Sequence, residues 1–377
     1  MIVKLGSLIS EYSVRNKADE DIPVYSVTNE QGFCTGYFSK EVASQDRTTY
    51  KIVPRGCFAY NPSRINVGSV DVQECEDRVI VSPLYVVFSV DEKLNRRYLL
   101  HYLKSDITLT YIKAYASGSV RDNLKFSILK DFPINLPSAE EQEQIVATLD
   151  GIEHLIALRK EEIASLDELV KSRFIELFGD VIRNNKAWQM RLFADIASSR
   201  LGKMLDAKQQ TGKCSYPYLA NFNVQWFRFN IENLNQMDFD EDDRTEFELK
   251  DGDLLVCEGG EIGRCAVWHN EIQPCFFQKA LHRVRCNRQI IHPDYLAWWF
   301  KYNCDYDGFA AIAGAKATIA HLPGVKLKQL HVAVPPLELQ EQFAAFVEQT
   351  DKSKLAVQKA LEELEILKKS LMQQYFG

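Results

Sequence analysis

The sequence has 377 residues, of which 46% are hydrophobic and 26% charged, a balance typical of a globular protein with two or three domains. No apolar run approaches the ~18 residues that cross a membrane, and the first residues are too polar for a signal peptide. The nine cysteines are scattered and form no CxxC pair, which argues against a zinc site or disulfide framework and favours reduced thiols in the cytosol.

The net charge of −7 is unusual for a nucleic-acid-binding protein, but it is unevenly distributed. Acidic residues exceed basic ones by seven in residues 139–180 and by two in residues 337–377, which leaves +2 on the rest of the chain. The acidity therefore belongs to two segments, and the other segments permit DNA binding without proving it.

Residues 1–135 are rich in Val, Tyr and Phe, with turn residues between short apolar runs. The pattern predicts strands at 52–53, 79–81 and 85–88, and turns at Pro54–Gly56 and Asn61–Ser63. It then predicts a helix at Asn95–Ser105, a loop at 115–126 and a last strand near Phe132–Leu136. We expect a mixed α/β globule.

Residues 136–180 are predicted to form one long helix, because apolar residues alternate at spacings of four and three. Pro137 suits the start of this helix and Gly179 its end. The apolar seam comprises Ile145, Leu149, Ile152, Ile156, Ile163, Leu166, Val170 and Leu177, with Arg159 and Arg173 on the same stripe.

Residues 181–333 repeat the element order of residues 1–135 with little sequence identity. Arg191–Ile196 corresponds to Lys4–Leu8, Lys250–Cys257 to Pro54–Asn61, and the predicted helix Pro293–Asn303 to Asn95–Ser105. Ala313–Leu330 corresponds to Tyr115–Phe132 at an offset of 198 residues, which pairs Leu124 with Leu322.

Residues 334–377 repeat the long helix at the same offset and without a gap. The identical positions are Pro137, Glu140, Gln142, Glu143, Gln144, Ala147, Leu166, Leu169, Lys171, Ser172, Phe178 and Gly179, which recur at Pro335, Glu338, Gln340, Glu341, Gln342, Ala345, Leu364, Leu367, Lys369, Ser370, Phe376 and Gly377. The second seam comprises Phe343, Val347, Val357, Leu361, Leu364, Leu371 and Tyr375, interrupted by Thr350, Lys354 and Lys368. A gapless match of this length is an internal repeat.

The shared seam predicts that the two helices pair as an antiparallel coiled coil, each about 60 Å long at about 1.5 Å per residue. The alternative is two amphipathic helices that cover separate cores. The expected fold class is α/β (α+β), with two globules separated by the paired helices and related by an approximate internal two-fold axis. Two such modules suit a DNA duplex read at two sites, and because the modules differ in sequence the two half-sites should differ.

The chain resembles the specificity subunits of type I restriction–modification systems over its full length. The resemblance rests on the order of variable segment and conserved helix, on the P-x-x-E-x-Q-E-Q start of each helix, and on the K-S-x-F-x-E-L-F-G-D sequence at Lys171–Asp180. The second helix departs from that ending but keeps Lys369, Ser370, Phe376 and Gly377.

The resemblance implies target-recognition domains at residues 1–135 and 181–333 that contact a split double-stranded DNA sequence, and spacer helices at residues 136–180 and 334–377. It also implies that methyltransferase subunits, two of them, and restriction–translocase subunits dock on this chain. S-adenosylmethionine, ATP and magnesium would be bound by those partners, so we expect no cofactor, no metal and no catalytic residue here. We also expect a cytoplasmic location.

The DNA-contacting residues are predicted from side-chain chemistry alone, since arginine suits guanine, asparagine suits adenine, and cations suit phosphates. In the first globule the candidates are Tyr60, Asn61, Arg64, Asn66, Ser117, Ser119, Arg121, Asn123 and Lys125. In the second they are Arg200, Lys203, Lys208, Lys213, Gln225, Arg228, Arg264, Gln278, Lys279, His282, Lys316, Thr318 and His321. The alternative for each group is an ordinary solvated loop, and for the histidines a structural role.

Catalysis finds little support, because the sequence has no glycine-rich methyl-donor motif, no Walker lysine and no HExxH motif. Two other functions stay open. One is a specificity subunit of another methylation-based defence system, and the other is a coiled-coil scaffold whose globules bind proteins.

Overall fold

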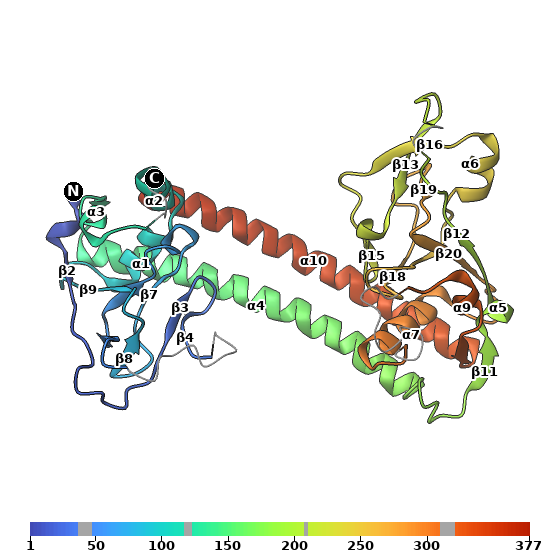
Figure 1. The fold of residues 1–377 in the computed structure, drawn as a ribbon, viewed down its shortest axis with the longest axis horizontal. Coiled ribbons are helices and arrows are strands. Elements are labelled where there is room, and N and C mark those ends of the chain that lie inside the picture. The colour runs from blue at the N-terminus through green and yellow to red at the C-terminus, as the bar shows by residue number, and fades with distance from the viewer. Residues whose placement is uncertain (37–46, 117–122, 207–209, 310–320) are drawn as a thin grey trace. The chain divides into compact units, whose positions relative to one another are not determined.

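The computed structural model of the chain describes residues 1–36, 47–116, 123–206, 210–309 and 321–377 (Figure 1). The chain divides into two compact units. Unit 1 comprises Met1–Glu162 and Val357–Gly377, and unit 2 comprises Ile163–Ala356. Two long helices, α4 (Ala139–Phe178) and α10 (Leu337–Phe376), contribute residues to both units.

The globule of unit 1 is built on a four-stranded antiparallel sheet in the order β2-β9-β6-β7. Phe58 of β6 lies opposite Phe88 of β9, and their rings stack with centroids 5.1 Å apart, which fixes the register of the central pair. The strands of unit 1 are β1 (Ile2–Lys4), β2 (Ile9–Glu11), β3 (Ser26–Thr28), β4 (Gly32–Cys34), β5 (Lys51–Pro54), β6 (Phe58–Tyr60), β7 (Val70–Val72), β8 (Arg78–Val81), β9 (Val86–Val90) and β10 (Pro133–Asn135). Smaller antiparallel pairs are β3-β4, β5-β8 and β1-β10.

Short helices complete unit 1. They are η1 (Leu5–Ser7), η2 (Ile65–Val67), α1 (Arg96–Lys104), α2 (Asp106–Ala116) and α3 (Phe126–Leu129). Helix α1 lies within the predicted range, and the Asn95 side chain caps it by accepting from the backbone N–H groups of Arg97 and Tyr98. Helix α2 was not predicted, because Ile and Thr in its first turns are weak helix formers.

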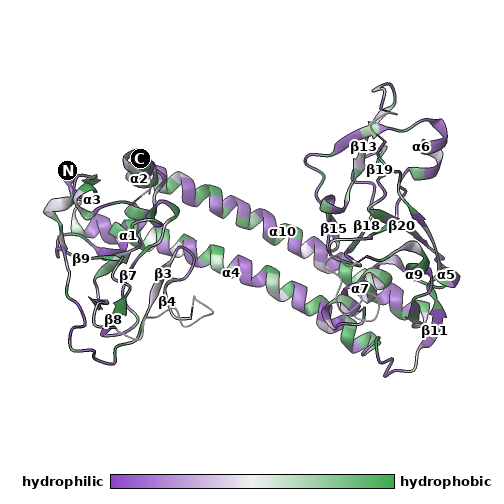
Figure 2. Cartoon of the chain, viewed as in Figure 1, coloured by the Kyte–Doolittle hydropathy of each residue, from purple (hydrophilic) through white to green (hydrophobic). Residues whose placement is uncertain are grey.

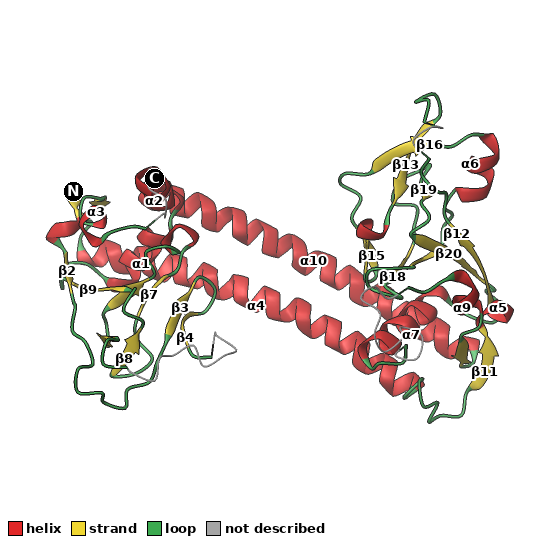
Figure 3. Cartoon of the chain, in the orientation of Figure 1, coloured by secondary structure: helices red, strands yellow, loops and turns green. Residues whose placement is uncertain are grey.

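The globule of unit 2 repeats this plan, with a four-stranded antiparallel sheet in the order β12-β20-β17-β18. A three-stranded sheet (β16-β13-β19) and the pairs β14-β15 and β11-β21 surround it (Figure 3). The strands are β11 (Gln189–Leu192), β12 (Ala197–Leu201), β13 (Ser215–Leu219), β14 (Val224–Gln225), β15 (Arg228–Phe229), β16 (Asn235–Asp238), β17 (Leu254–Cys257), β18 (Cys265–Val267), β19 (Phe276–Phe277), β20 (Leu281–Cys286) and β21 (His331–Val334). The helices are α5 (Phe193–Ile196), η4 (Asn221–Asn223), α6 (Glu241–Phe247), α7 (Pro293–Asp305) and α9 (Gly324–Lys328).

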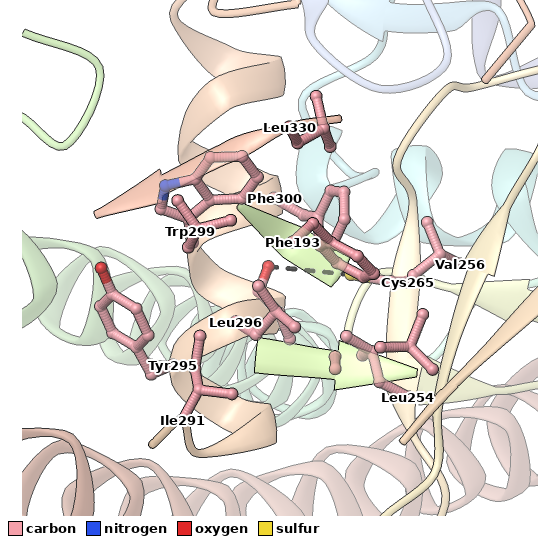
Figure 4. Packing of buried hydrophobic residues seen from close by; sticks show 14 of the residues in the cluster. Phe193, Leu254, Val256, Cys265, Ile291, Tyr295, Leu296, Trp299, Phe300 and Leu330 are labelled. Carbon is pink, nitrogen blue, oxygen red and sulfur yellow. Dashed lines mark hydrogen bonds between the residues drawn. The ribbon is translucent and has the colours of Figure 1, made fainter. Parts of the chain in front are cut away.

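The largest core cluster of unit 2 joins its sheet, α7 and both long helices. Figure 4 shows Leu296 and Phe300 of α7 facing the strand residues Leu254, Val256 and Cys265, whereas Tyr295 and Trp299 point to other sides of the helix. The Cys265 thiol donates to the carbonyl of Ala297 across 3.7 Å, which adds a polar contact between β18 and α7. Helices α7 and α1 correspond as predicted, but their cap residues His292 and Asn95 shift the match by one residue from the predicted pairing of Pro293 with Asn95.

The ends of α4 are set by local chemistry that the sequence predicted in part. Ser138 and Glu141 form a capping box: the Glu141 carboxylate accepts from the Ser138 N–H at 2.9 Å, and the Ser138 hydroxyl accepts from the Glu141 N–H. Helix α4 ends at Phe178, and Gly179 follows with φ of +72°, a left-handed conformation that favours glycine. The prediction that Gly179 ends the helix is confirmed.

The two long helices are in contact and antiparallel within each unit. In unit 1 Glu153 and Lys160 of α4 contact Lys368 and Glu365 of α10 respectively, so the α10 partner number falls as the α4 number rises. In unit 2 the ring of Phe178 packs on Phe343, and Lys354 bonds Asp167 at 2.5 Å. The fifteen predicted seam residues are all buried or half-buried, and Figure 2 shows apolar positions recurring along both helices.

No helix within the described ranges has the length and apolar character needed to cross a membrane. All nine cysteines are free thiols. Burial raises the pKa of Cys265, and raises the pKa of Cys275 to about 12, so these thiols are unreactive components of the core.

Candidate nucleic-acid interface

Both units use the same contact to fix the segment before their short helix α3 or α9. In unit 1 the Leu124 N–H donates to the carbonyl of Pro62 at 3.0 Å, just after β6. In unit 2 the Leu322 N–H donates to the carbonyl of Glu258 at 2.7 Å, just after β17. Two segments that are far apart in sequence, both predicted to contact DNA, therefore lie side by side in each unit.

The carbonyl of the same leucine is held by a different side chain in each unit. The Tyr60 hydroxyl donates to the Leu124 carbonyl at 3.1 Å, and His282 Nε2 lies 2.9 Å from the Leu322 carbonyl, to which it donates. Both side chains are almost fully buried, and burial raises the pKa of Tyr60 and lowers that of His282. We therefore remove Tyr60 and His282 from the candidate DNA contacts and assign them to anchoring these segments.

Among the other unit 1 candidates, Arg64, Asn123 and Lys125 are exposed, and Asn61 and Asn66 are half-buried. Arg64 and Lys125 are exposed and form no ion pair with the described residues, whereas the Asn61 side-chain oxygen accepts from the Ser63 N–H and hydroxyl. Of the remaining candidates, Ser117, Ser119 and Arg121 lie outside the described residues.

A polar hollow of about 470 Å³ adjoins Asn61 and Arg64. Its opposite wall is the turn between β3 and β4, where Thr28, Asn29 and Gln31 supply hydroxyl and amide groups. These three residues were missed by sequence reasoning, although the turn sequence Thr28–Gly32 is rich in side chains that bond base edges. Arginine, asparagine and glutamine around one hollow are suited to the major-groove edges of bases.

Three unit 2 candidates have internal partners instead. Lys203 is largely buried, pairs with Asp243 and donates to the Asp238 carbonyl at 2.8 Å. Arg264 donates to the Asn221 carbonyl at 2.9 Å and to Glu261 at 3.1 Å. Arg200 pairs with Glu246, so all three side chains stabilise the globule.

The unit 2 candidates that stay exposed or half-exposed lie on several loops. Lys213, Arg228, Lys279 and His321 are exposed without a carboxylate partner among the described residues, and Gln225 faces Arg228 across the β14-β15 pair. Gln278 is half-buried and accepts from the Ala280 N–H. Lys208, Lys316 and Thr318 lie outside the described residues.

Phe222, in unit 2, was also missed by sequence reasoning. Its ring is 55% exposed on η4, and its carbonyl accepts from the Gln225 amide at 3.1 Å. An exposed aromatic ring beside a glutamine and an arginine is a surface feature that suits contact with nucleotides. The only signal in the sequence is the aromatic and amide pattern of Asn221–Phe227.

The closest grouping of possible metal ligands within the described ranges is His101, Asp150 and Glu153 of unit 1, whose ligand atoms lie within 4.8 Å of one another. Arg97 binds Asp150 through two bonds of 2.8 and 3.3 Å, and Lys368 binds Glu153 at 2.7 Å. Because cationic side chains already neutralise both carboxylates, we assign this group as a charge network that ties α1 to the long helices.

A family model described as type I restriction modification DNA specificity domain matches residues 6–168 and 185–366. The chain is 26% identical over 193 residues to a putative type I restriction enzyme specificity subunit of Methanocaldococcus jannaschii, covering 50% of this chain and 45% of that protein. It is 24% identical over 276 residues to a putative specificity subunit of Haemophilus influenzae, covering 68% and 64%. The matches therefore span less than two thirds of the length of either relative.

Two solved structures share the fold over the full length of the chain. The crystal structure of a type I restriction–modification S subunit from M. genitalium has a TM-score of 0.59 at 15% identity, covering 96% of that chain. A chain from a structural study of assembly and conformational transition of a type I restriction–modification system has a TM-score of 0.59 at 16% identity, covering 97%. The two family-model matches cover both globules and most of both long helices, and the protein therefore belongs to the type I restriction modification DNA specificity family.

Proposed function

We propose that this chain is the specificity subunit of a type I restriction–modification complex and recognises a bipartite, asymmetric double-stranded DNA site. The observation that carries the proposal is the repeated family match: two globules share one sheet plan and one anchoring contact but present different exposed side chains. In this proposal residues 1–135 and 181–333 each read one half-site. The segments 136–180 and 334–377 set the spacing between them.

Catalysis would belong to partner chains. Two methyltransferase subunits would use S-adenosylmethionine, and restriction–translocase subunits would use ATP and magnesium, in the cytoplasm where the DNA is. Several apolar residues on the long helices are exposed and available to partner chains. They include Leu155, Leu158, Leu169, Leu355, Ile366 and Leu367.

The experiment is to co-express the chain with its methyltransferase subunit and map methylated adenines across a genome. A split motif is expected, and exchange of residues 1–135 for those of a relative should change only one half of it. An unchanged motif after that exchange would contradict the assignment of recognition to the globules. If the chain showed no salt-sensitive binding to duplex DNA, a protein-binding scaffold would be favoured instead.

Arg64 offers a test within one globule. Arg64→Ala should relax the choice of base at one position of one half-site, a loss of about 1–3 kcal/mol in discrimination. Lys17→Ala is the matched control, because Lys17 is also exposed in unit 1 but lies away from the hollow lined by Arg64. A motif that is the same for Arg64→Ala and the control would remove Arg64 from the interface.

A further inference from the structure

A cleft of about 880 Å³ lies within unit 2 between the first half of α10 and the globule. Four carboxylates line it, together with the cations Arg288 and Lys352 and the histidines His269 and His292. The carboxylates are Asp294, Glu341, Glu348 and Asp351. Val347 and the exposed Leu355 supply an apolar wall. The cleft is therefore both apolar and strongly negative.

Unit 1 shows how the equivalent position is built in the first copy. The buried Gln142 accepts from the N–H of the α1 cap residue Asn95 at 2.7 Å, and the buried Gln340 accepts from the N–H of the α7 cap residue His292 at 2.8 Å. These matched bonds align the two helices residue by residue. Arg97, two residues after its cap, therefore corresponds to Asp294.

The carboxylates of unit 1 at these positions have cations of their own. Arg97 binds Asp150 and Lys368 binds Glu153, as described above. The repeat places Glu348 and Asp351 of unit 2 at the positions of Asp150 and Glu153. The cap alignment places Asp294 at the position of Arg97. The repeat places the buried Val170 at the position of Lys368. Both neutralising cations of unit 1 are thus absent from the equivalent sites of unit 2.

The cations that remain near the cleft only partly compensate. Lys352 bonds Glu348 at 2.6 Å on the exposed surface, and His292 Nδ1 lies 3.2 Å from the Asp294 carboxylate. Lys354 lies 3.9 Å from Asp351 but bonds Asp167 at 2.5 Å. Desolvation raises the pKa of Asp351, and the carboxylates of Asp294 and Asp167 raise it further against the opposing effects of Lys354 and His269. The cleft keeps an excess of negative charge.

We propose that this cleft is a docking site for an arginine or lysine side chain on a segment of the methyltransferase subunit. The incoming cation takes the place between the carboxylates that Arg97 fills in unit 1, and its aliphatic stem packs on Val347 and Leu355. The occupant is a positively charged side chain because four carboxylates line the cleft. The inference rests on the proposed function, because it is that function which supplies a methyltransferase partner.

The test measures the affinity of the purified methyltransferase subunit for the full chain at low and high salt. Asp294→Arg brings a guanidinium to the position that Arg97 holds in unit 1, so the cleft is filled from within the chain. It should weaken association by about tenfold or more, and Glu348→Gln with Asp351→Asn should act in the same direction. Glu232→Gln with Glu241→Gln removes two exposed charges from the same unit outside the cleft and should leave the affinity unchanged. Thermal unfolding of each variant identifies any that lose the fold.

Each result has a defined meaning. Equal affinity of the folded cleft variants and the wild type overturns the inference and leaves the proposed function standing. No binding by the wild type overturns the proposed function together with the inference. A change in self-association or DNA affinity, with methyltransferase binding intact, assigns the cleft to a second copy or to DNA and also overturns the inference.

Discussion

The two units share their sheet order and several backbone contacts but differ in some of the side chains that make those contacts. The buried glutamines Gln142 and Gln340 make the same three backbone bonds in both, whereas the leucine carbonyl that anchors each loop is held by Tyr60 in one and by His282 in the other. The difference teaches that the two copies within this chain keep the same backbone contact but use different side chains to make it. Substitution of Gln142 or Gln340 should therefore lower the stability of the two units equally, whereas substitution of Tyr60 or His282 should not.

The largest expected contrast concerns Phe178 and its repeat partner Phe376. Phe178 is fully buried and its ring contacts Tyr295 at 4.7 Å, whereas Phe376 is half-buried against Tyr98 at 5.1 Å. Phe178→Ala should lower the free energy of unfolding of unit 2 by about 3–5 kcal/mol. Phe376→Ala should cost unit 1 about 1–2 kcal/mol, because less apolar area is lost.

Urea denaturation gives the magnitude for both variants, and hydrogen exchange shows which unit is affected. Ile366→Ala is the control, since Ile366 is largely exposed, and it should change stability by no more than about 0.5 kcal/mol. Equal losses for the two phenylalanines would show that the two halves of the helix pair are buried alike.

The next prediction is of equal effects. Gln142→Leu and Gln340→Leu each strip a backbone N–H and two carbonyls of their partners in a buried site. Each should cost its own unit about 2–4 kcal/mol in free energy of unfolding. The same denaturation and exchange measurements apply, with the exposed Gln349→Leu as control. A large loss in one unit only would mean that the shared bonds are not equally important.

A smaller contrast depends on pH. The folded-state pKa of His282 is lowered by burial, while the unfolded chain titrates near 6.5, so on acidification the unfolded state takes up the proton first. The free energy of unfolding of unit 2 should therefore decrease below about pH 6.5 and stop decreasing below the folded pKa. The hydrogen bond to Leu322 and the charge of Glu258 oppose this lowering of the pKa, and Lys328 assists it.

The matching unit 1 contact should be insensitive to acid, because the Tyr60 hydroxyl stays protonated throughout that range. Tyr60→Phe should lower the stability of unit 1 by about 1 kcal/mol at every pH. In His282→Gln the acid-dependent loss should diminish. If wild-type unit 2 and the His282→Gln variant showed the same pH dependence, His282 would not be its source.

The smallest expected effect is on the charge network of α1. Arg97→Gln should lower the stability of unit 1 by about 1 kcal/mol, since the pair with Asp150 is partly exposed, and 1 M salt should reduce this loss. Asp294→Ala, at the corresponding position, should change unit 2 by no more than about 0.5 kcal/mol. A loss for Arg97→Gln that salt does not alter would indicate a packing role for Arg97 instead.

Much of the fold could be predicted because its signals are local or periodic. The seam spacing predicted both long helices, and Gly179 predicted where the first one ends, since only a few residues accept its conformation. The repeat offset also predicted the correspondence of Leu124 and Leu322, whose N–H groups make the same contact in both units. These features need only neighbours in sequence or a second copy to be seen.

The candidate site could be predicted only in part, because side-chain chemistry does not reveal burial. Tyr60, Lys203 and His282 have the polar groups expected of DNA contacts, yet each bonds backbone or carboxylate groups within its own globule. Asn29 was missed since its place opposite Arg64 depends on the pairing of β3 with β4. Such relations join residues that no short-range pattern connects.

The assignment of Val357–Gly377 to unit 1 has a consequence for truncated chains. The N and C termini both belong to the unit built from the first part of the chain (Figure 1), and Phe376 packs against tyrosines of α1. Loss of Val357–Gly377 would remove helix from unit 1 and leave every residue of unit 2 in place.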